Sequence, residues 1–280
     1  MNPPLPPAIT PPVSPQNPQE SSQPSVAHWR WWIFLLLLGS APLLASLSGA
    51  GRAPDEAPQL PKSIPGLLLF CALQMGVFGV LWGGAWAFSR ASKDQLFLRW
   101  RDGWKSIAWG ALYSLALRLG IFVVALVVVV WVAIGLTALG YKPEQITALI
   151  EKNQPDVSKI FLPALQQKDP LYRFLLVTLV SFVVAGLREE LWRAATLAGM
   201  LHLAPEHWSQ KRKIGVALGV SSVLFGLGHV YQGPIGVALT GILGIGLGAI
   251  ILRHRSIWPA VIAHGFFNAA SFVALMLMRK

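Results

Sequence analysis

The chain has 280 residues, of which 54% are hydrophobic and only 12% are charged. A soluble domain normally carries about a quarter of charged residues, so this composition excludes an ordinary soluble protein. The net charge of +11 does not indicate nucleic acid as a partner, because the 23 basic residues are spread over short loops without an aromatic-basic stripe.

The N-terminal part of the chain changes character near residue 27. Residues 1–26 are rich in Pro, Ser and Gln and predict a disordered, Pro-rich cytoplasmic tail. Residues 27–90 hold two apolar segments, at about 29–47 and 64–88, which are long enough to cross a bilayer. We therefore predict that residues 27–90 form N-terminal transmembrane helices.

The rest of the chain, residues 91–280, carries five more apolar segments. They lie at about 107–139, 171–201, 214–231, 235–252 and 257–278. The loop between the first two of these has amphipathic spacing and is expected to be partly helical. The segment 235–252 is Gly-rich, which allows helices to approach closely. The predicted fold is all-α, a polytopic transmembrane helix bundle of about seven to eight spans.

Basic loops predict the orientation. The connections 89–105, 202–213 and 253–255 are positive and fall on the same side of a seven-span protein. The positive-inside rule then gives a cytoplasmic N-terminus, and we expect the plasma (inner) membrane as the location. Arg279 and Lys280 fall on the other side, a conflict that an eighth or re-entrant element would remove.

A charged cluster interrupts the segment 171–201. The stretch "LREELWR" places Arg188, Glu189, Glu190 and Arg193 within an apolar run, where each charge costs at least about 2.5 to 3.5 kcal/mol. Glu189 and Arg193 have i, i+4 spacing, so we expect them to pair, with Glu190 about 100° away around the helix. A structural ion pair between helices is the alternative to a functional site.

Two later motifs add polar groups to apolar segments. "FGLGH" places Phe225 and His229 one turn apart, and "HGFFN" does the same for His264 and Asn268. Polar faces of separate spans must turn toward one another or toward water, so one shared polar site is expected. Helical rise puts His229 about 22 Å from the preceding basic loop but His264 only about 10 Å from its own, so one helix must tilt, start deeper or extend beyond the surface.

These residue types can activate water. A carboxylate near two imidazoles can hold and deprotonate a water molecule, with or without a divalent metal, and an imidazole with an amide can bind a developing oxyanion. Zinc would use Glu189, His229 and His264 as ligands. The sequence contains neither a GxSxG nor an HExxH motif, so it supports neither covalent serine catalysis nor a zincin site.

The motifs "EELWR", "FGLGH" and "HGFFN" resemble the signatures of the CAAX-protease and bacteriocin-processing (CPBP, or Abi) family of intramembrane proteases. Family members carry Glu-Glu-x-x-x-Arg, Phe-x-x-x-His and His-x-x-x-Asn on separate helices in this order. The resemblance covers about residues 95–275 and implies that residues 91–280 are a protease domain. It also implies an endopeptidase for membrane-anchored, prenylated or leader-bearing peptides at the lipid bilayer, by a zinc-dependent or a metal-free mechanism.

The first motif is one residue shorter than the family pattern. Alignment on Arg193 puts Arg188 at the first family glutamate, whereas alignment on the acidic pair puts Glu189 there. We predict Glu189 as the essential base, with Glu190 and Arg193 organising it. His229 is expected to bind the water or a metal. His264 and Asn268 are expected to stabilise the oxyanion. The alternative is a catalytically inactive family member acting as a membrane scaffold or bacteriocin-immunity protein.

Overall fold

A computed structural model describes residues 27–49, 59–153, 164 and 166–278. The predicted disordered tail, residues 1–26, lies outside these ranges. Within them every regular element is a helix, so the predicted all-α class is confirmed. The elements in chain order are α1 (His28–Gly49), α2 (Ile64–Ser89), α3 (Lys105–Ala138), α4 (Pro143–Asn153), α6 (Pro170–Leu175), the π-helix η2 (Leu176–Leu187), α7 (Arg188–Leu203), α8 (Gln210–Leu227), the 3₁₀ turn η3 (Val230–Gln232), α9 (Gly233–His254) and α10 (Trp258–Leu277).

Each predicted apolar segment is helical, and α4 is the helical part expected in the loop after α3. Five stretches in the described part of the chain are long and apolar enough to cross a membrane. They are α2, α3, the continuous stretch Pro170–Leu203, the stretch Val230–His254 and α10. The protein is therefore an integral, multi-pass membrane protein.

The sequence sets several helix starts through capping side chains. Asp169 precedes Pro170, and its carboxylate accepts hydrogen bonds from the backbone N–H groups of Leu171, at 2.8 Å, and Tyr172. Ser209 caps α8 through the N–H of Arg212. These caps satisfy N–H groups that have no partner within the helix, and they fix where the segments carrying the charged cluster and His229 begin.

Close packing against α10 fixes the stretch before the charged cluster. The element η2 packs along α10, and Gly265 of α10 lies directly under the ring of Phe182. A Cβ at Gly265 would lie 2.2 Å from that ring, so only glycine allows this approach. η2 leads directly into α7, and its packing therefore sets the position of the acidic pair relative to α10.

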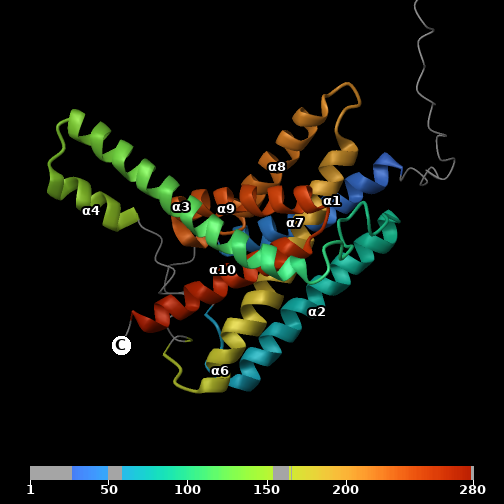
Figure 1. The fold of residues 1–280 in the computed structure, drawn as a ribbon, viewed down its shortest axis with the longest axis horizontal. Helices are drawn as coiled ribbons and strands as arrows, with labels where there is room; N and C mark the ends of the chain where they lie inside the picture. The colour runs from blue at the N-terminus through green and yellow to red at the C-terminus, as the bar shows by residue number, and fades with distance from the viewer. Residues whose placement is uncertain (1–26, 50–58, 154–163, 165, 279–280) are drawn as a thin grey trace, which may run out of the picture.

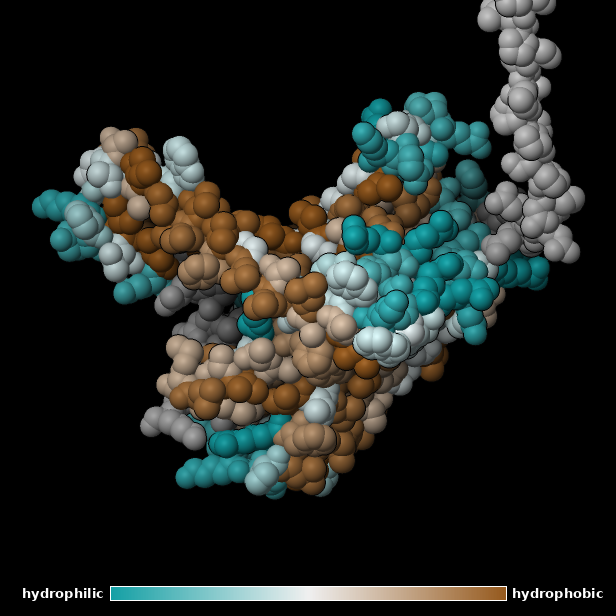
Figure 2. All heavy atoms as spheres, viewed as in Figure 1, coloured by the Kyte–Doolittle hydropathy of each residue, from teal (hydrophilic) through white to brown (hydrophobic). Residues whose placement is uncertain are grey.

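One part of the bundle extends away from the rest. The second half of α3 runs outward, and α4 lies beside its end (Figure 1). Side chains along this part of α3 are exposed, among them Phe122, Leu126 and Trp131, and Figure 2 shows a largely hydrophobic surface there. In a bilayer such a surface faces lipid.

Candidate active site

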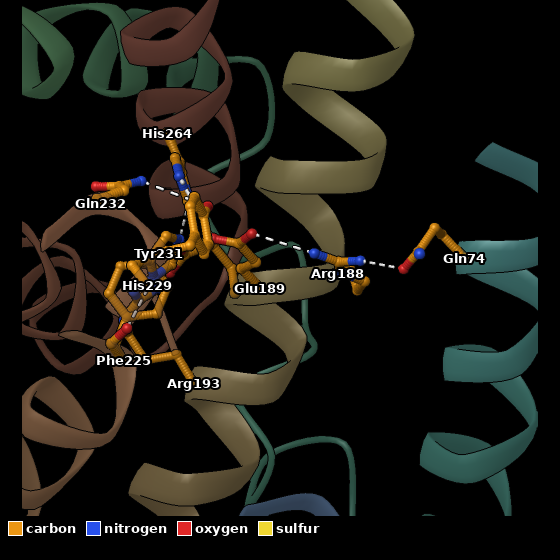
Figure 3. A network of polar contacts seen from close by, with 10 residues as sticks. Gln74, Arg188, Glu189, Arg193, Phe225, His229, Tyr231, Gln232 and His264 are labelled. Atoms are coloured by element: carbon orange, nitrogen blue, oxygen red, sulfur yellow. Dashed lines mark hydrogen bonds and ion pairs between the residues drawn. The ribbon is translucent and has the colours of Figure 1, made fainter. Parts of the chain in front are cut away.

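Three parts of the fold supply the candidate site. The first turns of α7 present Glu189, Glu190 and Arg193, the end of α8 and the turn after it present Phe225 and His229, and the second turn of α10 presents His264. Figure 3 shows Glu189, Arg193, Phe225, His229 and His264 converging. The shared polar site expected from the sequence therefore has a structural counterpart.

Glu190 lies at the closed side of the site. Its side chain is 0% exposed, and one of its oxygens, Oε1, accepts a hydrogen bond from Arg193 Nη1. The same oxygen accepts from His264 Nδ1 at 2.8 Å. The guanidinium of Arg193 lies 4.0 Å from the ring centroid of Phe225 and is itself fully buried. Glu190 thus fixes the imidazole ring of His264.

The predicted pairing of Glu189 with Arg193 is wrong. Arg193 pairs with Glu190, three residues earlier, because positions i+3 and i+4 are about equally close on a helix. Phe225 packs against the guanidinium of Arg193, and His264 bonds to Glu190, so these contacts favour the pair of Arg193 with Glu190. Glu189 points about 100° away, toward a more open side.

Glu189 has a different set of neighbours. Its Oε1 lies 3.3 Å from Arg188 Nη2, and Arg188 Nη1 donates to Gln74 Oε1 of α2 at 2.7 Å. Its other oxygen, Oε2, lies 3.8 Å from His264 Nε2. His264 therefore faces both glutamates, Glu190 through Nδ1 and Glu189 through Nε2.

His229 lies in the connection between α8 and α9 rather than within a long helix. Its Nδ1 is 2.8 Å from the carbonyl oxygen of Phe225. A carbonyl can only accept, so Nδ1 carries the hydrogen, and Nε2 of the neutral ring keeps its lone pair. The ring of Phe225 contacts both His229 and His264, at centroid distances of 4.8 and 6.2 Å. Both imidazoles thus pack against the ring of Phe225.

The sequence predicts different depths in the membrane for His229 and His264, and the positions of α7 and α8 bear on this difference. The helix α8 ends at Leu227, and the corner between α7 and α8, with the basic run 211–213, projects beyond the other helices (Figure 1). Of the solutions that the sequence left open, an extension of this basic run beyond the rest of the bundle agrees with the fold.

The Gly-rich helix α9 makes room for the site, as expected from its small residues. A Cβ at Gly244 would lie 3.2 Å from the ring of Phe225, and one at Gly248 would lie 3.7 Å from Cδ of Arg193. Phe225 and Arg193 therefore lie close against the backbone of α9. A Cβ at Gly244 would be tight against Phe225, whereas one at Gly248 would be in ordinary contact with Arg193.

Asn268 is the one predicted site residue outside the contact network. It lies one turn after His264 on α10 and is half-buried. Its amide makes no hydrogen bond with any residue that the structure describes. The amide N–H groups are thus free to donate to a substrate.

Two neighbours of the site were missed by the sequence analysis. Gln74 anchors Arg188, and the signal for it is a single amide within the apolar segment 64–88. Tyr231 lies beside His229, with ring centroids 5.7 Å apart, and its hydroxyl oxygen accepts from Gln232 Nε2 at 3.4 Å. The hydroxyl hydrogen of Tyr231 remains available as a donor.

Carboxylate and imidazole groups are suitable zinc ligands, but the described side chains do not place three of them around one point. No group of three or more His, Cys, Asp or Glu side chains placed to hold a metal ion occurs among residues 27–49, 59–153, 164 and 166–278. Zinc binding by Glu189, His229 and His264 stays a prediction.

Comparison with known proteins bears on the motifs. Residues 171–270 match the family described as type II CAAX prenyl endopeptidase Rce1-like, and this stretch contains all three motifs. Comparisons with curated proteins and with solved structures gave no match. The match confirms the resemblance drawn from the motifs: residues 171–270 are similar to the Rce1-like CAAX endopeptidases of the CPBP family.

Proposed function

We propose that this protein is an intramembrane endopeptidase that hydrolyses peptide bonds of membrane-anchored substrates with a water molecule activated by Glu189. The observation that carries the proposal is the position of His264 between two unlike glutamates. Glu190 and Arg193 hold one side of the imidazole in a buried pair, and Glu189 meets the other side where water and substrate can reach it.

The distance between Glu189 and His264 suits a shared water. Their facing atoms, Oε2 and Nε2, are 3.8 Å apart. A water placed about 2.8 Å from each would have an angle of about 85° between its two hydrogen bonds, near that needed to donate to both. Nδ1 of His264 donates to Glu190, so Nε2 of the neutral ring accepts from this water.

The proposed steps use side chains only. The water oxygen attacks the scissile carbonyl carbon while Glu189 takes its proton. Asn268 and the Tyr231 hydroxyl are the donors available to the oxyanion of the tetrahedral intermediate. The carbon–nitrogen bond then breaks, and protonated Glu189 returns its proton to the leaving amine. The His229 Nε2 lone pair can accept from the N–H of that amide and orient it.

The proposed substrate class follows from place and family. The site lies on apolar helices, which favours a substrate that enters from the membrane. The family that residues 171–270 match is described by its action on prenylated CAAX ends. We therefore propose short, prenylated or otherwise membrane-anchored peptides as substrates.

Cleavage by the purified protein in liposomes tests the proposal. The assay compares prenylated with unprenylated membrane-anchored peptides and the parent with Glu189→Ala and His229→Ala. We expect cleavage by the parent and its loss in both variants. A chelator arm separates the two mechanisms, since a metal-free enzyme keeps its rate. A folded parent that cleaves no peptide in the set would contradict the proposal.

A second candidate function, a membrane scaffold that does not cleave peptides, is favoured by one contact. Arg188 occupies the place of a family glutamate when the motif is aligned on Arg193, and it pairs with Glu189. Under this reading the parent is folded but inactive. The variant Arg188→Glu restores the family spacing Glu-Glu-x-x-x-Arg, so a gain of cleavage in this variant would identify Arg188 as the cause.

A further inference from the structure

An isolated charge lies within the most apolar helix. Arg118 is the only Asp, Glu, Lys or Arg between residues 106 and 138, all of them in α3. It lies 13 residues, or about 20 Å, from the start of that helix. A guanidinium at such depth is costly in lipid and is a candidate functional group by default.

The contacts of Arg118 hold its side chain without neutralising it. Its Nη2 donates to the backbone carbonyl of Phe267 and to Ser271 Oγ, the latter at 3.2 Å, and the guanidinium carbon lies 4.5 Å from the centroid of the Phe267 ring. In the part of the chain that the structure describes, Arg118 has no carboxylate partner, and neither Nε nor Nη1 has a hydrogen-bond acceptor. Neither of these two nitrogens is among the fully buried polar atoms that lack a hydrogen-bond partner.

The same face of α10 carries the candidate site and the contact of Arg118. His264, Asn268 and Ser271 follow one another at intervals of four and three residues, so they form one stripe. Gly265, which packs against η2, lies on one side of this stripe. Phe267, which contacts Arg118, lies on the other side. Arg118 therefore stands at the far end of a polar stripe that begins at His264.

The direction in which Arg118 points argues against a lipid phosphate. A mid-span arginine reaches headgroups by extending its side chain toward the membrane surface. Arg118 instead turns inward and is fixed to the backbone of α10. From Leu119 onward most apolar side chains of α3 are exposed, although Ile121 still packs against the core. The later part of the helix runs outward (Figure 1). The free N–H groups thus lie beside α10, near the last turn of α3 that packs against the core.

We propose that Arg118 binds the C-terminal carboxylate of the peptide substrate. This inference rests on the proposed function and adds a specificity residue to it. A carboxylate is the anionic group that every free peptide end carries, and guanidinium N–H groups bind it with strong charge-assisted hydrogen bonds. Seven residues of α10, about 10 Å, separate His264 from Ser271. An extended peptide covers that length with about three residues, so Arg118 would also fix how far from the end cleavage falls.

Peptide binding tests the inference independently of turnover. The probe is a short fluorescent prenylated peptide with either a free C-terminal carboxylate or a C-terminal amide. Its dissociation constant is measured in nanodiscs of neutral lipid. We expect the parent to prefer the carboxylate by at least about tenfold, the usual effect of a hydrogen bond to a charged group. Arg118→Gln should bind both peptides alike, and Arg118→Lys should keep part of the preference.

Matched variants separate recognition from structure. Arg173→Gln removes an arginine of α6 that bonds to the carbonyl of Gln167, away from the stripe, and should keep the full preference. If the only role of Arg118 is to hold α3 against α10, Arg118→Gln will lower the unfolding temperature and weaken the binding of both peptides equally. That result overturns the inference. A dependence of the Arg118 effect on added anionic lipid overturns it in favour of a phosphate.

Cleavage of the same two peptides distinguishes the two proposals. A parent that cleaves carboxylate and amide peptides equally well, and binds them equally, keeps its protease function and contradicts the role of Arg118. A parent that prefers the carboxylate in binding but cleaves neither peptide contradicts the protease function and leaves Arg118 as a carboxylate site.

Discussion

The closed side and the open side of α7 place two consecutive glutamates in opposite surroundings. On the closed side, Glu190 has no exposed surface and is enclosed by Arg193 and His264. On the open side, the Glu189 side chain is 17% exposed and meets Arg188, which is 27% exposed. One residue of helix, about 100°, makes this difference. The comparison supports the proposed division of roles, in which Glu190 positions the site and Glu189 acts on water.

The closed side is not built for maximal stability. Glu190 Oε2 and two nitrogens of Arg193, Nε and Nη2, are buried without a hydrogen-bond partner in the described part of the molecule. Buried ion pairs with incomplete hydrogen bonding contribute little net stability, although breaking them is costly. We infer that the pair is kept for its hold on His264.

The largest expected effect is on the closed side. Glu190→Gln should lower the free energy of unfolding by about 3 to 5 kcal/mol, because it leaves the charge of Arg193 buried without a partner. Unfolding by denaturant in micelles measures this loss. Glu144→Gln, on exposed α4, serves as the control and should change stability by less than about 0.5 kcal/mol.

A double variant sharpens the same prediction. Glu190→Gln combined with Arg193→Gln leaves no unpaired buried charge, so its loss should be well below the sum of the single losses. Additive losses would show that the two side chains do not stabilise one another, and the distinction between the two sides of α7 would then fail.

A smaller effect is expected where α8 meets α9, the contact that supports Phe225. A Cβ at Gly226 would lie 2.6 Å from the carbonyl oxygen of Val237, which is backbone and cannot turn away. Gly226→Ala should therefore cost about 1 to 3 kcal/mol of unfolding free energy through overpacking. Gly219→Ala, on the same helix with open space at the Cβ position, should be neutral or slightly stabilising. Equal losses in the two variants would contradict this packing.

The smallest effect is expected on the open side. Gln74→Leu removes the anchor of Arg188, and Arg188→Gln removes the cation beside Glu189. Partly exposed ion pairs contribute roughly 0 to 1 kcal/mol, so each variant should lose less than about 1 kcal/mol of unfolding free energy. A loss as large as that of Glu190→Gln would mean that the open side is structural as well.

Helix positions and the convergence of the polar side chains followed from the sequence because they depend on local signals. Apolar runs of sufficient length predicted the helices, and the i, i+4 spacing of polar residues within them predicted a shared site. The same pattern predicted Glu190 and His264 in one site, since polar faces of membrane helices must turn toward one another or toward water.

Partner choice within the site did not follow from the sequence. Arg193 can reach Glu189 or Glu190 equally well, and only Phe225 and His264, distant in sequence, decide in favour of Glu190. The π-helix η2 could not be predicted from the sequence either. Its stretch is apolar on every side, so it has no periodic pattern that would distinguish a π-helix from an α-helix. Both features depend on tertiary packing.

The central claim is that Glu189 acts on water while Glu190 holds the site, and the variant Glu189→Gln tests it most directly. The measurement is the rate of peptide cleavage at matched folded fraction, with unfolding followed on the same sample. We expect the rate to fall by about 10²- to 10⁴-fold, the usual contribution of a general base, with stability changed by less than about 1 kcal/mol. An undiminished rate, or a loss of folding in place of a loss of rate, would contradict the claim.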